Sequence, residues 1–526
     1  MSATSAHSEG ALGEQPASAA APPPADRAED GQPVHSRLLA RLGRAVAAHR
    51  AFSVVLAAAT LLRIVVMLGY PPAMFFNDSY NYLTDAIIHV PDPIRSSGYP
   101  LFLFFLEEFH NLSVVTGLQA LMGLAVGVGL YAVLRRRGLP AWGAIVCSLP
   151  VLFDAYELQL EHMVASDVLF YTLLTAALIL LCWWDRPPVV AAVLAGLMVG
   201  YAATVRNVGE IMLVFIIAGM LARRMGWRPI VAALVAGLAP IIAYMFWYQA
   251  GTGRFAMSAG DGTFLYSRVQ TFTDCAKIKP PPNLAGLCDP RPPADRENSQ
   301  EYLWANDTPL ARWTGPYNVF RFTPQVEKGT GRFAEWAIEA QPLAYASVVA
   351  GNIGTTFEWS KVNANNPVGN LEGDGSKFRF TSTVWPVPAW VTEYPANRKA
   401  ATEFGGADFG QPKVVRPWAG FLEAYQPVYL RGPFLLLFVL AGLAGVVLSA
   451  RRREWARGGV GGPGLMSWMV GAALIVLPPM TAGFSYRYAL AAVPAVCLAA
   501  GLAFAGRGNL MTWVRNRSSR LQLFNI

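Results

Sequence analysis

Long apolar segments recur along the chain, and each is close to the length that crosses a lipid bilayer as a helix. A transmembrane helix needs about 20 predominantly apolar residues. Of the 526 residues, 54% are hydrophobic and only 14% are charged. We therefore predict an all-α polytopic membrane protein with about ten transmembrane helices. The predicted spans are residues 52–70, 112–134, 141–153, 168–184, 189–205, 208–221, 229–248, 432–450, 465–483 and 489–505.

Basic residues occupy the short loops on one side of these predicted spans. Three consecutive arginines, Arg135 to Arg137, follow the second span, and further arginines follow the sixth and the eighth. Because Lys and Arg concentrate in short cytoplasmic loops, we place this side in the cytoplasm and the protein in the plasma membrane. The net charge of +8 then reflects topology and contact with anionic membrane lipids. No patch of interleaved basic and aromatic residues indicates a nucleic-acid partner.

This orientation divides the chain into segments on either side of the membrane. Residues 1–50 are rich in Ala, Pro, Ser and Glu and lack the apolar core of a signal peptide, so we expect a disordered cytoplasmic segment. Structureless loops as long as residues 251–431 are uncommon, which predicts a small mixed α/β domain outside the cytoplasm. The other predicted parts are an N-terminal transmembrane module (51–250) with a first outer loop (71–111), C-terminal transmembrane helices (432–506) and a basic cytoplasmic tail (507–526).

The cysteines fall into two groups. Cys147, Cys182 and Cys497 lie in or at the end of predicted spans, and we expect them to pack as small apolar side chains. Cys275 and Cys288 lie in the predicted outer domain, where an oxidising compartment favours a disulfide. Two free thiols are the alternative. No spacing of Cys and His indicates a zinc site.

The first predicted outer loop carries two charged residues that could do chemistry. Asp78 follows the first span directly. A carboxylate in such partly apolar surroundings can keep a raised pKa and accept a proton from an incoming hydroxyl. Alternatively, Asp78 or a neighbour is the N-cap of a short interfacial helix. Arg95, further along the loop, is either a phosphate ligand or a solvated loop charge.

A second group of polar residues lies between the third and fourth predicted spans. Asp154, Glu157 and Glu161 share one helical face, where they could bind a metal ion or sugar hydroxyls, or form a solvated surface. Glu161 and His162 come shortly before Asp167, which lies at the outer end of the fourth span. Burial there could shift the pKa values of these side chains. Asp167 has a helix N-cap as its alternative role.

Arginines on the outer side are unusual, because Lys and Arg concentrate in the cytoplasmic loops, so each of them is expected to have a partner or a function there. Arg206 ends the fifth predicted span, and Arg487 with Tyr488 precedes the last one. Guanidinium forks match phosphate oxygens, which makes both arginines candidate ligands of a lipid phosphate. Arg63 lies inside the first span and needs a partner there, unless its side chain snorkels to the outer interface.

Taken in this order, these segments resemble the GT-C class of membrane glycosyltransferases. The closest likeness is to the group that uses polyprenyl-phosphate sugars, which includes protein mannosyltransferases and aminoarabinose transferases. The stretch around Asp78 is similar to the acidic motif of that group's first outer loop, and residues 95–103 are similar to the Gly-Tyr-Pro-Leu segment that follows it. Residues 161–170 are similar to the segment that brings a second acid, with Asp167 at the matching position. Arg206 and Arg487 match positions near the lipid phosphate.

The resemblance implies an inverting transfer of a sugar from a polyprenyl-phosphate donor to a hydroxyl on the outer face of the membrane. The acceptor would be a cell-envelope glycan, a lipid or a protein. Asp78 would be the catalytic base. The expected lipid-phosphate ligands are Arg487, Arg206, Arg95 and Tyr488, and the expected substrate-binding residues are Glu161, His162, Asp167, Tyr80 and Tyr82. No cofactor is firmly expected, although a divalent metal is possible in this class.

Two other functions fit the sequence. A flippase or transporter of lipid-linked sugars would use its intramembrane charges as a pathway, with inverted repeats around it. A non-catalytic membrane protein could instead bind envelope glycan through its outer domain, because function lives in a site and not in a fold. Several tryptophans could stack on sugar rings there or form the core of that domain, namely Trp304, Trp313, Trp359, Trp385 and Trp390.

Overall fold

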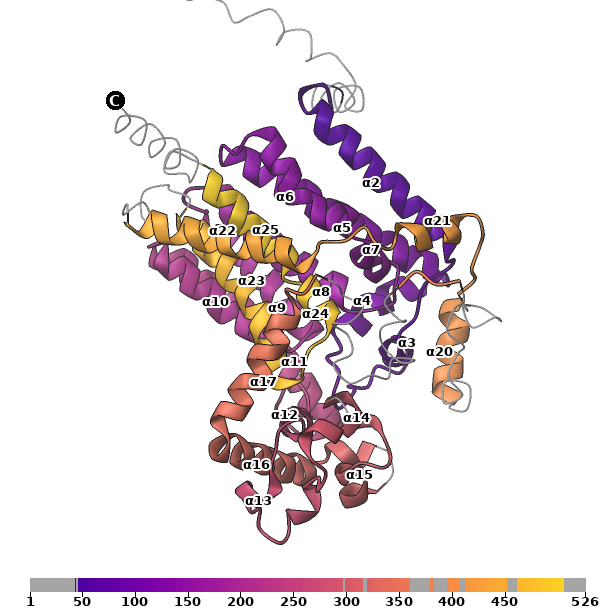
Figure 1. Ribbon diagram of the computed structural model, residues 1–526. Helices are drawn as coiled ribbons and strands as arrows, with labels where there is room; N and C mark the ends of the chain where they lie inside the picture. The colour runs from indigo at the N-terminus through magenta and orange to yellow at the C-terminus, as the bar shows by residue number, and fades with distance from the viewer. Residues whose placement is uncertain are drawn as a thin grey trace, which may run out of the picture. The chain divides into compact units, whose positions relative to one another are not determined.

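The regular elements of the protein are helices (Figure 1). The computed structural model describes residues 43, 46–296, 299–315, 319–359, 379–382, 395–405, 412–451 and 461–505. The chain divides into the compact units Met1–Val54 and Val55–Ile526, and the packing described below belongs to the second. Most of the predicted N-terminal segment, and all of the predicted basic tail, lie outside the described residues.

Within the described ranges, six helical segments are long and apolar enough to cross a membrane, which makes this a multi-pass membrane protein. A seventh results if α6 (Ala141–Phe153) and α7 (Ala155–Glu161), which are bent by 55° at the break between them, form one broken span. The six segments are α2 (Arg50–Gly69), α5 (Leu112–Arg136), α11 (Trp227–Thr252), α22 (Gly432–Arg451), α23 (Gly461–Thr481) and the pair α24 (Tyr486–Leu490) and α25 (Val493–Phe504).

The prediction of about ten spans therefore holds in part. Helices lie at all ten predicted positions, but three of them are apolar and short. These are α8 (Asp167–Trp183), α9 (Val189–Val205) and α10 (Val208–Ala222), with 17, 17 and 15 residues. They fall below the length that spans a typical bilayer without tilt or thinning.

Small residues allow α9 to pack closely against α11. A Cβ atom added at Gly196 would lie 2.2 Å from the carbonyl oxygen of Ala233, and one added at Gly200 would lie 2.2 Å from that of Gly237. Such backbone approach is how helices associate in lipid, where apolar side chains gain little by leaving the bilayer. Packing against α11 thus holds the short α9 among the longer apolar helices.

The two ends of the helices differ in chemistry. At one end, Arg137 donates to the Cys182 carbonyl at 2.5 Å and pairs with Asp185. Arg223 donates to the Leu181 carbonyl at 2.8 Å. The basic loops after α5 and α10 therefore meet at the C-terminal end of α8. Asp167 begins α8, so it lies at the opposite end from these loops.

Backbone hydrogen bonds join the loop after α2 to the loop between α7 and α8. Met74 forms an isolated parallel bridge with Met163. The Met74 amide donates to the His162 carbonyl at 2.8 Å, and the Val164 amide donates to the Met74 carbonyl at 3.1 Å. Two helices of the first loop follow, α3 (Asn77–Ile88) and α4 (Gly98–Glu107), and they pack on each other. This bridge brings the start of α3 close to the start of α8.

The described part of residues 251–431 contains helices and no strand, so the predicted mixed α/β domain is wrong in its class. Its short apolar segments, broken by Gly and Pro, did not distinguish strands from short helices. The elements are α12 (Asp261–Gln270), α13 (Cys275–Ile278), η1 (Ala285–Leu287), η2 (Pro293–Asp295), α14 (Ser299–Trp304), α15 (Pro309–Thr314), η3 (Val319–Phe322), α16 (Pro324–Ala340), α17 (Pro342–Thr355), α20 (Pro395–Gly405) and α21 (Trp418–Tyr425).

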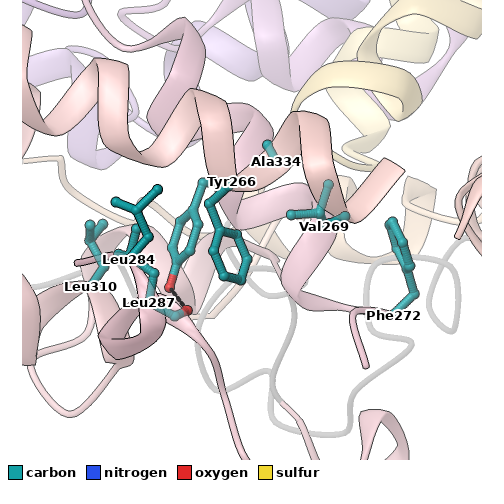
Figure 2. Packing of buried hydrophobic residues seen from close by; sticks show 9 residues of the cluster. Tyr266, Val269, Phe272, Leu284, Leu287, Leu310 and Ala334 are labelled. Carbon is teal, nitrogen blue, oxygen red and sulfur yellow. Dashed lines mark hydrogen bonds between the residues drawn. The ribbon is translucent and has the colours of Figure 1, made fainter. Parts of the chain in front are cut away.

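A compact apolar core holds the first part of this segment together (Figure 2). It joins α12 to α16, because Tyr266 and Val269 pack with Phe333 and other buried side chains. The Tyr266 hydroxyl donates to the Leu287 carbonyl at 2.8 Å, which satisfies its polar end inside the core. Trp313 packs against this core and is therefore a structural residue in this segment.

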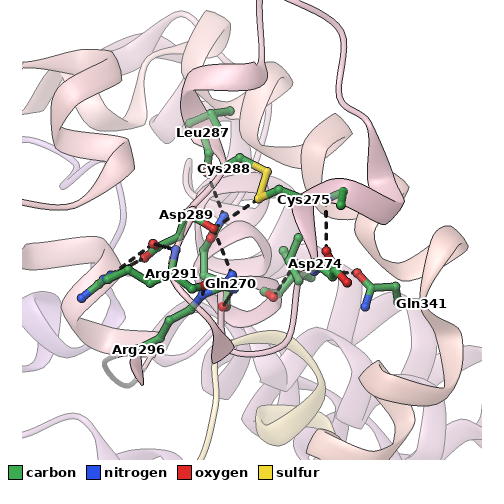
Figure 3. The surroundings of a disulfide bond; sticks show 12 residues. Gln270, Asp274, Cys275, Leu287, Cys288, Asp289, Arg291, Arg296 and Gln341 are labelled. Atoms are coloured by element: carbon green, nitrogen blue, oxygen red, sulfur yellow. Dashed lines mark hydrogen bonds and ion pairs between the residues drawn. A yellow bond between two sulfur atoms is a disulfide. The ribbon is translucent and has the colours of Figure 1, made fainter. Parts of the chain in front are cut away.

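A disulfide joins Cys275 to Cys288, the pair that the sequence predicts (Figure 3). Beside it, the Asp274 amide donates to Gln341 at 2.7 Å, which connects the disulfide loop to the end of α16. Arg296 donates to the Asp289 carbonyl at 3.0 Å on the other side. Cys147, Cys182 and Cys497 lie in the apolar helices, and their thiols are free and buried.

We expect peptide mapping without reductant to recover Cys275 bound to Cys288. The two cysteines are 13 positions apart, and closing a loop of this size stabilises a protein by about 3 kcal/mol, so Cys275→Ser should lower the unfolding free energy by about that amount. Cys182 serves as the control, because its free thiol should be alkylated once the protein is denatured. Alkylation of Cys275 and Cys288 under the same conditions would contradict the pairing.

Candidate functional site

Asp78, in the first turn of α3, lies between two arginines. Its Oδ1 accepts from Arg95 Nε at 3.0 Å, and its Oδ2 accepts from Arg487 Nη2 at 3.1 Å. Burial alone would raise the pKa of Asp78, but the charges of Arg95 and Arg487 outweigh it and hold the pKa at about 2. Asp78 is therefore an ion-paired carboxylate, and its side chain does not cap α3.

Asp167, the first residue of α8, holds the other side of Arg487. Its carboxylate is 1% exposed and lies 3.8 Å from Arg487 Nη1. It also pairs with Arg206, which ends α9. Its side chain makes no N-cap hydrogen bond in α8, where Ser166 is the N-cap residue. Arg487 thus lies between two carboxylates from different helices.

Asp92 fixes Arg95 from the loop between α3 and α4. Its Oδ1 accepts from the backbone amides of Ile94 and Arg95 at 2.7 and 2.8 Å, and its Oδ2 lies 3.4 Å from Arg95 Nη1. Burial would lower the pKa of Arg95, but Asp78 and Asp92 raise it above its ordinary value. Arg95 therefore stays charged, with its side chain held towards Asp78.

The result is a continuous ionic chain at one end of the helices. Its members alternate in sign and come from α3, the following loop, α24, α8 and the end of α9. We call these five residues the ionic chain: Arg95, Asp78, Arg487, Asp167 and Arg206. Within the ionic chain three guanidiniums meet two carboxylates, and Asp92 is a third acid beside Arg95. An added phosphate would therefore compete with a carboxylate for an arginine, whose planar fork matches phosphate oxygens.

Aromatic rings cover the guanidiniums of the ionic chain. Arg487 lies 4.8 Å from the ring centre of Phe76 and 5.5 Å from that of Tyr488. Arg206 lies 5.0 Å from the same Tyr488 ring. Such faces attract cations and restrict their side chains to a few positions. The predicted phosphate ligand Tyr488 is therefore part of the site, between two arginines.

One tryptophan of the long segment reaches this site. Trp304, on α14, has its ring centre 5.9 Å from the Arg95 guanidinium. Trp359 instead lies against Arg431, at 5.6 Å. The other two tryptophans considered for sugar stacking, Trp385 and Trp390, lie outside the described residues.

The two predicted tyrosines of α3 lie differently. The Tyr82 hydroxyl shares a hydrogen bond of 3.2 Å with Ser166, next to Asp167, and burial raises the pKa of Tyr82 to about 12. Tyr82 therefore connects α3 to the start of α8 beside the ionic chain. Tyr80 is buried and stacks on Phe75, with ring centres 5.1 Å apart.

Glu161 and His162, predicted to bind substrate, contact other partners. Glu161 pairs with Arg63 at 2.6 Å, and both side chains are buried. Arg63 also donates to the Leu152 carbonyl at 3.0 Å, so it has the partner that its position within a span requires. His162 Nε2 lies 2.8 Å from the Tyr70 carbonyl. These contacts tie α2 to α7, and neither residue joins the ionic chain.

The carboxylates that precede Glu161 do not form a solvated face. Asp154 and Glu157 are both buried. Asp154 is the N-cap of α7, where it accepts from the Tyr156 amide at 2.8 Å, and it also accepts from the Leu430 amide at 2.8 Å. The helical periodicity predicted one face for all three acids, but Asp154 precedes α7 as its N-cap with extended backbone, and the periodicity could not show that α7 packs inside the protein.

Gln119 is a positioning residue that the sequence interpretation missed. Its amide nitrogen donates to the carbonyls of Glu161 and Met163 at 2.8 and 2.7 Å, and its oxygen accepts from the Tyr99 hydroxyl at 2.7 Å. It thereby holds the loop before Asp167 and the helix α4 together. A polar residue in the middle of a predicted span was the available signal, because such a side chain needs partners in lipid.

The described residues give no arrangement of three or more His, Cys, Asp or Glu that could hold a metal ion. No protein-family model, no curated protein and no solved structure matches the chain. The resemblance to GT-C glycosyltransferases therefore rests on the motif residues alone, and no family is identified.

We expect the Arg63 and Glu161 pair to be important for stability. Arg63→Met would leave the Glu161 carboxylate buried without its charge partner, which should cost about 3–5 kcal/mol of unfolding free energy. The double variant Arg63→Met with Glu161→Gln should recover much of that loss in a double-mutant cycle measured by unfolding in detergent.

The control for this cycle is an ion pair of the same protein in which the acid is exposed and the arginine is not. Asp185→Asn removes the partner of Arg137 at a side chain that is 64% exposed, so it should cost at most about 1 kcal/mol. If Arg63→Met costs no more than Asp185→Asn, the buried pair does not have the importance assigned to it.

Proposed function

We propose that the protein is an inverting glycosyltransferase that moves a sugar from a polyprenyl-phosphate donor to a hydroxyl acceptor. The acceptor would be a cell-envelope glycan, a lipid or a protein. The observation that carries the proposal is the convergence of Arg95, Arg206 and Arg487 on two carboxylates at the ends of membrane-associated helices. The motif resemblance to GT-C enzymes agrees with this proposal.

The location suits a ligand that is part lipid and part phosphate. Arg487 follows directly on Tyr486 at the start of a candidate span, so a phosphate there would sit where a lipid headgroup lies. The side chains of Arg95, Arg206 and Arg487 are 16%, 17% and 11% exposed, so they are only partly enclosed. In such surroundings, guanidiniums bind a phosphate more strongly than they would in water.

In the proposed reaction, the acceptor oxygen attacks the anomeric carbon of the donor sugar. The bond between that carbon and the phosphate oxygen breaks, and its electron pair leaves with the polyprenyl phosphate. The acceptor hydroxyl gives its proton to the Asp78 carboxylate, which acts as general base. Arg487 and Arg206 stabilise the negative charge that grows on the departing phosphate.

The geometry adds a condition to the role of Asp78. A carboxylate whose pKa is held at about 2 by two arginines is a weak base. A donor phosphate bound by Arg487 competes with Asp78 for that guanidinium, and the pKa of Asp78 rises as the contact weakens. We infer that donor binding activates the base, which would limit proton abstraction to the complex with donor.

Asp167 and Tyr488 have supporting roles in this proposal. Asp167 holds Arg206 and lies near Arg487, so it would orient both guanidiniums towards the phosphate. The Tyr488 ring lies against the same two arginines. We also propose about ten membrane passes in a plasma membrane, with the ionic chain on the outer face, as the distribution of arginines between the loops favours.

We expect Asp78→Asn to reduce sugar transfer by about 100- to 10,000-fold, because the amide cannot accept the hydroxyl proton. The assay would supply a panel of polyprenyl-phosphate sugars to the purified protein and follow transfer to envelope acceptors. Asp307→Asn is the matched control, since it changes an exposed acid on the loop before α15.

Full transfer activity in a folded Asp78→Asn variant would remove the general base from the proposal. Movement of intact donor across the bilayer, without transfer by the wild-type protein, would favour a transporter instead. Neither activity with any donor would favour a non-catalytic glycan-binding protein.

We expect Arg487→Ala to raise the KM for the lipid donor by about 10- to 100-fold, because one charged hydrogen-bond partner of the phosphate is lost. Arg487→Lys should be intermediate, since it keeps the charge but loses the planar fork. Arg332→Ala, at an exposed position on α16, is the control for net charge. An unchanged donor KM in Arg487→Ala would assign this residue a structural role only.

A further inference from the structure

Arg268 is a buried arginine that has no acidic partner among the residues that the structure describes. It lies in the last turn of α12 and is 2% exposed. Its Nε has no hydrogen-bond partner, and no carboxylate in the described ranges lies within ion-pair distance of it. Burying a charge in this way is costly unless something compensates it.

The groups around Arg268 do not supply that compensation. With its amide turned so that the oxygen faces the guanidinium, Asn352 accepts from Nη1 and Nη2 at 3.0 and 3.1 Å. Arg296 provides a comparison, because it is buried to a similar degree. Its guanidinium donates to three backbone carbonyls, at 2.7, 2.8 and 3.0 Å. Burial lowers the pKa of Arg268 to about 10, and nearby Tyr345 only partly opposes this. One neutral amide oxygen therefore faces a whole positive charge.

The position of Arg268 is at the end of a candidate membrane span. Asn352 and Tyr345 both belong to α17, and the Tyr345 hydroxyl donates to the Met480 carbonyl at 2.9 Å. Met480 lies in the last turn of α23, a candidate span. Figure 1 shows α17 running between α16 and the region of α22 and α23, and α17 packs on both α16 and α23.

One side of α17 packs against the apolar core through Ala344, Tyr345 and Val348, and the rest of the helix is not covered by the described residues. None of its residues is buried, although its sequence is largely apolar, and Leu343 at its start is 84% exposed. An apolar helix in contact with the end of a span is suited to the boundary between lipid tails and headgroups. That boundary is where lipid phosphates lie, and basic pockets between helices bind such groups.

We propose that Arg268 is an anion site that takes a phosphate group, separate from the ionic chain. The phosphate would displace the Asn352 amide oxygen from Nη1 and Nη2, and a further oxygen would accept from Nε. A planar guanidinium matches a phosphate in this bidentate way. The source of the phosphate is the headgroup of a membrane lipid or a free phosphate, and the position beside α17 and α23 favours the headgroup. This inference does not depend on the proposed sugar transfer.

The test uses the full-length protein in nanodiscs of phosphatidylcholine, with and without phosphatidylglycerol, and inorganic phosphate as a separate probe in lipid-depleted detergent. Hydrogen exchange in peptides that cover α12 and α17 is the readout. We expect phosphatidylglycerol to slow exchange in both helices of the wild-type protein. Arg268→Gln keeps a polar side chain but loses the charge and the planar fork, so it should need about tenfold more phosphatidylglycerol for the same protection.

Arg332→Gln removes one positive charge from an exposed position on α16 and should behave like the wild-type protein. Protection by inorganic phosphate alone would support the site with a soluble ligand. Protection that is equal in wild type and Arg268→Gln, or no protection by either probe in wild type, would overturn the proposal. The wild-type measurement decides this even if Arg268→Gln fails to fold, and Arg268→Lys, which keeps the charge without the fork, provides a second variant.

Discussion

Arg487 contacts two carboxylates, and this shared ion pair organises the end of the protein that holds the candidate site. Through Asp78 it connects α24 to α3, and through Asp167 it connects α24 to α8. Charges at the ends of apolar helices persist only in sets that neutralise and hydrogen-bond one another. The helices that form this set are far apart along the chain, from α3, which begins at Asn77, to α24, which begins at Tyr486. The candidate site therefore exists only where these helices pack together.

The buried ion pair of Arg63 and Glu161 differs from the ionic chain in its surroundings. Arg63 and Glu161 form an isolated pair whose guanidinium is also bonded to backbone carbonyls. This pair is fully buried, and its guanidinium is held by one carboxylate and two or more carbonyls, although Arg63 Nε and Glu161 Oε2 have no hydrogen-bond partner among the described residues. In the ionic chain the arginine side chains are partly exposed, at 11 to 17%, and each of them lies beside at least one carboxylate. This contrast separates charges that stabilise helix packing from charges that are available for chemistry.

Much of the candidate site could be predicted from the sequence, because charged residues that directly flank apolar segments must lie at the ends of helices. Asp78, Arg206 and Arg487 were found in this way. The sequence could not separate Glu161 from Asp167, although they are only six positions apart. The turn between them directs one side chain towards α2 and the other towards α9, and hydrophobic periodicity contains no information on such a turn. It also could not show that the long segment is helical, since short apolar runs between Gly and Pro fit both classes of structure.

The bridge between Met74 and Met163 has a consequence for how this site can vary in evolution. The approach of the loop before Asp78 to the loop before Asp167 is made by peptide groups, and not by the methionine side chains. Every amino acid except proline carries the donor that is needed at positions 74 and 164. Positions 74 and 164 could therefore vary while the two acids keep their separation, as long as the Gln119 and Ser79 side chains still donate to the Met163 and Val164 carbonyls. The geometry of the site can outlast recognisable similarity in the residues that support it.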